Sequence, residues 1–238
     1  MQTPYGEFYD EDIAALEFQL QWYMKYGNLP TTVRRESNIA KMDYGIQYER
    51  YIGHIYETHG FRVTYQGICA GLQDGGIDLI ARAPRKIRLV QCKRWIQPIS
   101  TDVLSRLQGA KERFIWEYNR NKSTHNRMSI CAVLATSGPV TEDAKQMARH
   151  LGIAILENLH YAPYPAVKAK RILPDAGKFL LPFTPGYDRL SLNLNKGDCF
   201  FSTVRDAAAN GFFYPAYYAK NIAEMNRQKM KNKSVDKM

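Results

Sequence analysis

The chain has 238 residues, enough for one ordinary domain with appendages or for two small domains. Its apolar fraction of 45% is typical of a globular protein with a buried core. The net charge of +10 favours a polyanionic partner, most commonly nucleic acid, although a positive surface that serves only solubility would give the same charge. No run of about 18 apolar residues is present, which argues against a membrane-spanning helix, and the first residues lack a signal-peptide pattern.

The cysteines are widely spaced in the sequence, and no Cys-x-x-Cys pair is present. This spacing argues against a disulfide scaffold and against a cysteine zinc site. Free cysteines are usual in a reducing compartment, so we expect a cytoplasmic protein. The residues concerned are Cys69, Cys92, Cys131 and Cys199.

Residues 1–40 are predicted to form an N-terminal helical segment. The acidic run that starts at Asp10 suits a helix N-terminus, and apolar residues then recur at helical spacing until Gly27. We expect this helix to pack on the domain that follows or on a partner.

Residues 41–160 are predicted to form an α/β domain. A helix over residues 43–59 ends at Gly60, a strand follows over residues 61–68, and a glycine-rich loop leads to residue 76. The loop allows the backbone to approach a ligand closely.

Two apolar strands joined by a tight turn at residues 84–86 carry the candidate site. Side chains two apart on a strand share a face, so Gln91 and Lys93 point the same way, and the adjacent strand can bring Asp78 close to them. A carboxylate, an amide oxygen and an ammonium at one point suit a hard cation beside a phosphodiester. A buried Asp–Lys pair with a polar neighbour, as in ordinary sheets, is the alternative.

Phosphodiester hydrolysis would give each of these groups a role. Asp78 would be the chief metal ligand, and the Gln91 side-chain oxygen and the Cys92 backbone carbonyl would complete part of the ligand set. Such a set suits Mg²⁺, which binds few carboxylates and retains several waters, and Mn²⁺ is an alternative. Lys93 would orient or help to deprotonate the attacking water and would stabilise the developing negative charge.

A helix over residues 101–118 follows, and its charged side could track phosphates, although such a side is usually only solvated. The apolar run at residues 130–135 predicts a strand covered on both faces. A helix from Thr141 and a strand at residues 153–156 complete a mixed sheet flanked by helices. The candidate nucleic-acid contacts of this domain are Arg94, Arg106, Lys111, Arg113 and Ser137. A structural capping role is the alternative for Ser137.

The chain after residue 160 is predicted to form a proline-rich linker, a small ββα unit and a basic tail, over residues 161–176, 177–215 and 216–238. In the ββα unit, residues 189–194 alternate as a strand, residues 199–201 form the returning strand, and a capping box at Thr203 begins a helix. The tail is either a phosphate-binding arm or a frayed terminus.

The segment from Tyr44 to about Asn158 resembles the Mrr-type restriction endonucleases, a branch of the PD-(D/E)xK nuclease superfamily. The order and spacing of several motifs carry the resemblance, which covers about half of the chain. These motifs are Tyr48-Glu49, Gly60-Phe61-Arg62-Val63, Gly75-Gly76-Ile77-Asp78, Gln91-Cys92-Lys93 and Thr136-Ser137-Gly138. Ile77 stands where the superfamily name has proline. Gln91 stands where it has an acid, a form typical of the Mrr branch that removes one negative charge from the metal site.

The resemblance implies a restriction-endonuclease-like α/β fold and a metal-dependent DNA endonuclease. It suggests defence against foreign DNA, or its processing, in a prokaryotic or phage setting. It also implies that Glu49 faces the active site and orients a water molecule or the lysine; a solvated residue paired with a neighbour is the alternative. Because double-strand cutting usually needs two active sites, we expect a homodimer or a complex with a separate protein.

The C-terminal unit resembles the small zinc-binding module of Ada-type DNA repair proteins, but the ligand cysteines of that module are absent here. We therefore expect no zinc, and a role in packing or DNA docking. A non-cleaving DNA-binding or scaffold subunit on a nuclease-like fold is the rival interpretation of the whole chain, since the net charge suits it equally well. A structural protein that recruits a partner is a third interpretation, which does not account for the central motif.

Overall fold

The computed structural model describes residues 2–3, 6–7, 10–27, 38–70, 75–120, 128–174 and 176–215. The chain divides into two compact units. The central unit contains Met24–Tyr164 and Asp188–Ser191, and the terminal unit contains Met1–Tyr23, Pro165–Tyr187 and Leu192–Met238. No helix of the described part is long and apolar enough to cross a lipid bilayer. The predicted basic tail over residues 216–238 lies outside the described residues.

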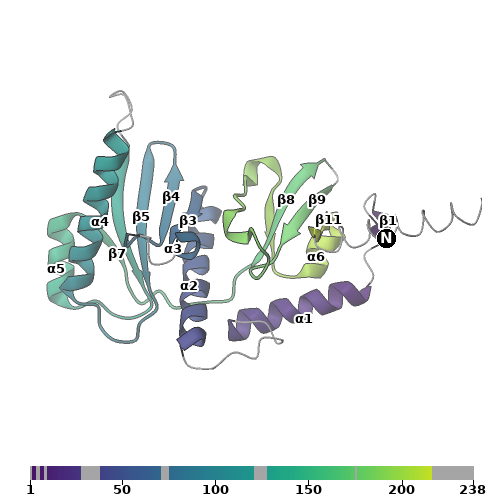
Figure 1. The fold of residues 1–238 in the computed structure, drawn as a ribbon, viewed down its shortest axis with the longest axis horizontal. Coiled ribbons are helices and arrows are strands. Elements are labelled where there is room, and N and C mark those ends of the chain that lie inside the picture. The colour runs from purple at the N-terminus through teal and green to yellow at the C-terminus, as the bar shows by residue number, and fades with distance from the viewer. Residues whose placement is uncertain are drawn as a thin grey trace, which may run out of the picture. The chain divides into compact units, whose positions relative to one another are not determined.

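The central unit is built on a mixed sheet with the strand order β3-β4-β5-β6-β7 (Figure 1). Its strands are β3 (Arg62–Tyr65), β4 (Leu79–Ala83), β5 (Lys86–Lys93), β6 (Ser129–Thr136) and β7 (Ile153–Leu156). The pairs β3–β4 and β4–β5 are antiparallel, whereas β5–β6 and β6–β7 are parallel. A parallel pair needs a crossover, which the helices between these strands provide.

Helices cover both faces of this sheet, α2 on one and α4 with α5 on the other (Figure 1). They are α2 (Asn38–Thr58), α4 (Thr101–Arg120) and α5 (Glu142–Leu151). Tyr48 of α2 packs in one core cluster with Leu79 and Val90, and Leu104 of α4 packs in another with Leu134. The predicted mixed sheet flanked by helices is thereby confirmed.

The strand predicted over residues 61–68 is shorter than expected. β3 ends at Tyr65, and the chain turns directly into the short helix α3 (Gln66–Ala70). The Gly67 N–H donates to the Asp78 carbonyl at 2.9 Å, so α3 is held against the start of β4 instead of extending the sheet. The prediction for residues 66–68 is therefore wrong.

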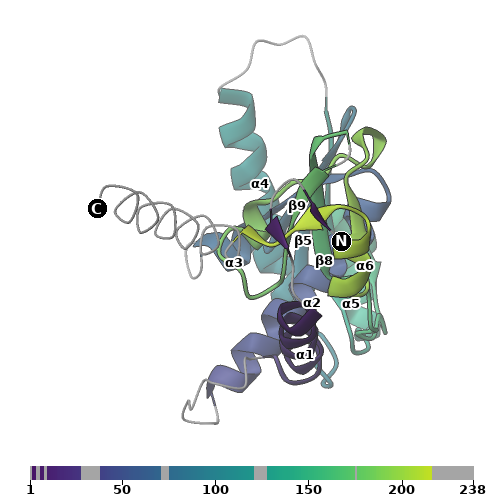
Figure 2. The same cartoon turned by 90° about the vertical axis from the view of Figure 1, so that its right-hand side faces the viewer.

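The terminal unit contains a second sheet with the order β10-β8-β9-β11. β8 and β9 lie side by side in Figure 2, and a further pair, β1–β2, lies near the N-terminus. Its strands are β1 (Gln2–Thr3), β2 (Gly6–Glu7), β8 (Val167–Leu173), β9 (Ala176–Leu180), β10 (Cys199–Phe201) and β11 (Phe212–Phe213). The terminal unit also contains the helix α6 (Val204–Ala209) and the 3-10 turn η3 (Leu194–Lys196). The helix α1 (Asp10–Tyr26) belongs to this unit as far as Tyr23.

The N-terminal helix was expected to pack on the domain that follows it or on a partner. Its buried residues include Leu16 and Leu20, and Glu17 Oε2 accepts the Val204 N–H at 2.6 Å. Glu17 thus supplies an acceptor at the start of α6, where the helix leaves its first N–H groups unpaired. Within the terminal unit, α1 is therefore tied to a helix that lies far away in the sequence.

Two local predictions for the C-terminal region are corrected by the structure. Residues 189–194 are not a strand: the 3-10 turn η2 (Tyr187–Arg189) and then η3 occupy this part of the chain. Asp198 explains the turn, because its carboxylate accepts the N–H groups of Arg171 and Asn193 at 2.9 and 2.8 Å. In addition, β8 begins within residues 161–176, where a linker was expected. The predicted returning strand and the helix capped by Thr203 are confirmed.

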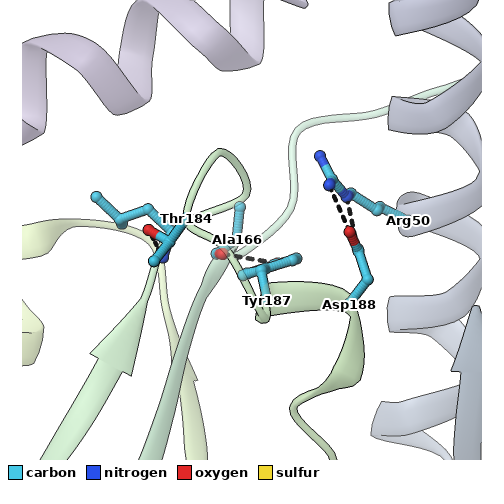
Figure 3. A network of polar contacts seen from close by, with 6 residues as sticks. Arg50, Ala166, Thr184, Tyr187 and Asp188 are labelled. Carbon is cyan, nitrogen blue, oxygen red and sulfur yellow. Dashed lines mark hydrogen bonds and ion pairs between the residues drawn. The ribbon is translucent and has the colours of Figure 1, made fainter. Parts of the chain in front are cut away.

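Within the central unit, an ion pair holds residues Asp188–Ser191 on α2. Arg50 donates from Nε and Nη2 to the two carboxylate oxygens of Asp188 at 2.8 and 2.6 Å (Figure 3). Such a forked pair fixes both direction and distance. In the terminal unit, the Tyr187 hydroxyl donates to the Ala166 carbonyl at 2.8 Å (Figure 3).

Candidate active site

The start of β4 and the end of β5 meet through the side chain of Asp78. Because β4 begins at Leu79, opposite Val90, the end of β5 extends past it, and the Cys92 N–H needs another acceptor. Asp78 Oδ2 accepts this N–H at 2.6 Å, while the Asp78 N–H donates to the Val90 carbonyl at 3.0 Å. The Asp78 carboxylate therefore continues the hydrogen bonding of the sheet and lies at its open edge.

Glu49 of α2 reaches the same edge from the helix side. A Cβ atom on Gly67 would lie 2.8 Å from Glu49 Oε2 and 3.1 Å from Asp78 Oδ1. The two oxygens are thus no further apart than the sum of these distances. The structure brings the two carboxylates together at a point that only a glycine leaves open.

Gln91 leaves β5 on the other face of the sheet. Val90 and Cys92 belong to the core cluster beneath α2, so strand alternation directs Gln91 and Lys93 towards the face that α4 covers. Gln91 is only 8% exposed, and its Oε1 has no hydrogen-bond partner among the described residues. A buried oxygen without a donor costs free energy, so Gln91 is suited to accept a hydrogen bond from, or to ligate, a group outside the chain.

Lys93 ends β5 in a half-buried position. Its Nζ lies 5.5 Å from the centroid of the Trp95 ring, and its carbonyl accepts the Ser137 N–H at 3.0 Å. Lys93 is the last residue of the strand, and its flexible stem lets the ammonium turn towards the edge where Asp78 lies.

The charges at this edge act together on the Cys92 thiol. Burial, and then the carboxylates of Asp78 and Glu49, raise the pKa of the Cys92 thiol well above its ordinary value, whereas the Lys93 ammonium opposes them. The thiol is therefore neutral, and the candidate contribution of Cys92 to the site is its backbone. In a strand the N–H and C=O of one residue point to the same edge, so the Cys92 carbonyl points to the edge at which Asp78 accepts its N–H.

Two of the candidate nucleic-acid contacts lie at the end of β5. The exposed Arg94 guanidinium lies over the rings of Tyr44 and Tyr161, 4.7 and 5.7 Å from their centroids. The Ser137 hydroxyl donates to the Trp95 carbonyl at 3.1 Å, so Ser137 holds the chain that follows β5. The helix cap considered for Ser137 is provided by Thr141, whose Oγ1 accepts the Ala144 N–H.

The other three candidates lie on α4. Arg106 is exposed and donates to the Asp102 carbonyl at 3.4 Å within its own helix. Lys111 donates to the Leu151 carbonyl at 3.1 Å, at the end of α5, where a cation is favoured by the helix dipole. Arg113 donates to the Gly75 carbonyl at 2.6 Å, in the turn before β4. Lys111 and Arg113 thus make contacts that stabilise the fold.

A cavity of about 310 Å³ lies beside the start of β4. Its lining includes Gln66 and Ile77, which are the neighbours of Gly67 and Asp78 in the sequence, together with Arg113 and Phe114 of α4. The cavity is therefore lined by the residues that directly precede Gly67 and Asp78 in the sequence and by one side of α4.

The importance of Gly67 was missed at the level of sequence. A glycine inside a predicted strand is a signal for close approach of another group, and Gly67 lies inside the predicted strand over residues 61–68. That signal does not identify the approaching groups, because Glu49 and Asp78 come from other elements.

The oxygen atoms at this edge suit a hard divalent cation. Among the described residues, no three His, Cys, Asp or Glu side chains gather into a metal site. Hard cations, however, also bind amide and backbone carbonyl oxygens. The carboxylates of Asp78 and Glu49 and the Cys92 carbonyl at this edge are oxygen donors of the kind that Mg²⁺ and Mn²⁺ bind, and Gln91 Oε1, which has no partner among the described residues, is a further candidate donor from the neighbouring face.

Gly67→Ala is expected to reduce the nuclease activity that the sequence predicts, while leaving stability almost unchanged. The new methyl group would occupy the space between Glu49 and Asp78, whereas alanine is a better helix former than glycine. We expect at least about a tenfold loss, since misplacement of about 1 Å in an active site can cost 100-fold. Plasmid cleavage and urea unfolding would measure both effects, with Gly45→Ala, where a Cβ meets nothing within 4 Å, as the control. Parental activity would contradict the geometry.

Comparison with family models identifies the central unit. A model described as a restriction endonuclease, of the Mrr catalytic type, matches residues 39–159. This segment runs from α2 to β7 and contains Glu49, Asp78 and Lys93. No significant match is found among curated proteins or among solved structures. At the level of the family, the activity is that of a DNA nuclease. The chain therefore belongs to the Mrr-type restriction endonucleases.

Proposed function

We propose that this protein is a metal-dependent DNA endonuclease whose active site is the open edge of β5. The observation that carries the proposal is the meeting of the Glu49 and Asp78 carboxylates at Gly67, beside the Cys92 backbone. Two acids converge there on an edge that also exposes a carbonyl. A pure binding module would not need such an arrangement of buried charge.

Asp78, Gln91 and the Cys92 carbonyl would hold the cation, with Glu49 beside them. When bound, Mg²⁺ supplies charge stabilisation to the scissile phosphodiester. The hydrogen bond from the Cys92 N–H fixes the Asp78 carboxylate, so that its remaining lone pairs have a constant direction. Because Gln91 is neutral, the site carries one negative charge fewer than the superfamily pattern.

Lys93 would act on the attacking water and on the developing charge. Its ammonium donates hydrogen bonds and bears a positive charge, so it stabilises the negative charge that grows on the phosphate oxygens. Glu49 would orient the water or the lysine. Arg94 and Arg106, both exposed, would neutralise neighbouring phosphates.

Plasmid cleavage tests the proposal. Supercoiled DNA is incubated with the protein in Mg²⁺ or Mn²⁺, with and without EDTA. Nicked or linear products that depend on the metal are expected. DNA binding without any metal-dependent product would instead support a non-cleaving DNA-binding or scaffold subunit, which the positive net charge of +10 also suits.

The biological setting is proposed by the same reasoning. Defence against foreign DNA, or its processing, in a prokaryotic or phage cytoplasm would employ such a nuclease. Cleavage of both strands needs two active sites, which a homodimer or a separate partner protein would supply. Sedimentation of the protein with and without DNA would measure the number of copies.

Gln91→Glu is expected to tighten metal binding. The change restores an acid at a position whose oxygen is buried and lacks a partner in the described structure, so the cation would gain a charged ligand. The Mg²⁺ concentration for half-maximal cleavage should fall by about tenfold, because one charge-assisted contact contributes a free energy of roughly that size. Gln108→Glu, on the exposed part of α4, is the control. A higher Mg²⁺ requirement in Gln91→Glu would count against Gln91 as a ligand.

A further inference from the structure

Two large apolar side chains are exposed directly after the proposed catalytic lysine. Trp95 is 46% exposed, and Ile96 is 92% exposed. Single exposed apolar residues are ordinary on protein surfaces. Two consecutive ones beside a reactive group are less easily attributed to chance, and their surroundings show that they are displayed by a fixed backbone.

The backbone of this segment is anchored on the chain that follows β6. The Trp95 carbonyl accepts the Ser137 hydroxyl, and a Cβ on Gly138 would lie only 2.4 Å from that carbonyl. The Ile99 N–H then donates to the Pro139 carbonyl at 3.0 Å. The segment from Trp95 to Ile99 is thus held at both ends, and the side chain of Ile96 is held in water although its exposure is unfavourable.

The position of the indole ring indicates what it contacts. The Trp95 centroid lies 5.5 Å from Lys93 Nζ, the atom that would touch the scissile phosphate. Bases are stacked about 3.4 Å apart along each strand, so a ring at this distance lies within one or two base steps of that phosphate. The neighbouring guanidinium of Arg94 is exposed and adds positive charge, which favours nucleic acid over an apolar protein partner.

We propose that Trp95 and Ile96 form an apolar wedge that contacts the bases of DNA beside the cleaved phosphodiester. Trp95 stacks on a base, and Ile96 enters the adjacent base step and opens it. Aromatic rings stack on bases of any sequence, and apolar side chains such as isoleucine are used to unstack base steps. This inference rests on the proposed function, because it takes the phosphate at Lys93 as the reacting group.

Tryptophan fluorescence tests the contact without any cleavage. The chain has three tryptophans, so Trp22→Phe with Trp116→Phe leaves Trp95 as the sole emitter. The experiment is done in EDTA, and binding of a DNA duplex is followed by anisotropy. Bound DNA should quench the fluorescence of Trp95 and reduce its quenching by acrylamide by at least about threefold. The control protein keeps Trp116 instead, which is exposed near the far end of α4, about 20 Å along the helix from Thr101. Its emission should not change.

Cleavage kinetics test the wedge itself. Ile96→Asn should reduce the cleavage of paired DNA by about tenfold and lose much less on a mismatched duplex, whose bases are already partly unstacked. Leu156→Asn, which alters an exposed apolar residue on β7, is the matched control and should cleave both DNAs at the parental rate. An equal loss on paired and mismatched DNA would overturn the wedge.

The outcomes separate this inference from the proposed function. Plasmid cleavage together with an unprotected Trp95 in the DNA complex overturns the wedge and leaves the nuclease standing. Protection of Trp95 by DNA without metal-dependent cleavage supports the contact and contradicts the proposed nuclease function. Failure of the protein to bind DNA overturns the proposal. A change from dimer to monomer in Ile96→Asn, without protection of Trp95 by DNA, also overturns it and assigns this surface to contact between copies of the chain.

Discussion

Lys93→Ala should abolish Mg²⁺-dependent cleavage of plasmid DNA while DNA binding stays within a few fold of the parental value. Lys93 is the last residue of β5, and its ammonium opposes the effect of the Asp78 and Glu49 carboxylates on the pKa of the Cys92 thiol. Loss of a group that transfers or orients a proton costs about 100- to 10,000-fold in rate. Initial rates of nicking, measured at saturating Mg²⁺, would give the effect.

The control for this experiment lies on the same strand. Lys86 begins β5, at the opposite end from Lys93, and is exposed. Lys86→Ala removes the same charge from the protein and should leave the cleavage rate within about twofold, because exposed charges far from a site are screened. A Lys93→Ala variant that cuts at the parental rate would remove Lys93 from the mechanism.

Two substitutions of Asp78 should separate its structural role from its metal role. Asp78→Asn keeps an oxygen that can accept the Cys92 N–H but loses the negative charge. Asp78→Ala loses both. We expect neither variant to cleave DNA. The free energy of unfolding of Asp78→Asn should lie within about 1 kcal/mol of the parental value. Asp78→Ala leaves a buried N–H unpaired, so its free energy of unfolding should be lower by about 1–3 kcal/mol.

Urea unfolding and plasmid cleavage would be measured on both variants. The metal assignment would be contradicted by an active Asp78→Asn protein. Equal stability of the two variants would show that the 2.6 Å hydrogen bond to Cys92 contributes nothing that water cannot replace. The two results are independent, so each role can fail alone.

The strand pattern at the centre of the molecule could be predicted from the sequence because its signals are local. Alternation along β5 and a tight turn at Arg85, which has φ of 60°, fix the hairpin that places Asp78 beside Val90. The same reasoning placed Gln91 and Lys93 on one face. It did not foresee that Asp78 would lie at the edge between the two faces, because the bond to the Cys92 backbone depends on where β4 begins.

The rest of the site depends on contacts between distant parts of the chain. Glu49 and Asp78 meet at Gly67, and each belongs to a different element. Sequence alone gives the elements but not the distance between them. The same limit explains the terminal unit, where β8 pairs with β10 across a long separation. Asp198 accepts the N–H of Asn193, which lies in the stretch that was predicted to be a strand, and the N–H of Arg171 in β8.

The pair between Arg50 and Asp188 bears on how far the catalytic module extends. Arg50 follows Glu49 on α2 and is 7% exposed, so its charge is compensated inside the protein by a residue beyond the end of the segment that matches the family. A fragment that stopped at residue 160 would lose this ion pair, and breaking a buried ion pair by removing one partner costs about 3–5 kcal/mol. We therefore expect a stable fragment of the central unit to need residues 188–191 in addition to the segment that matches the family.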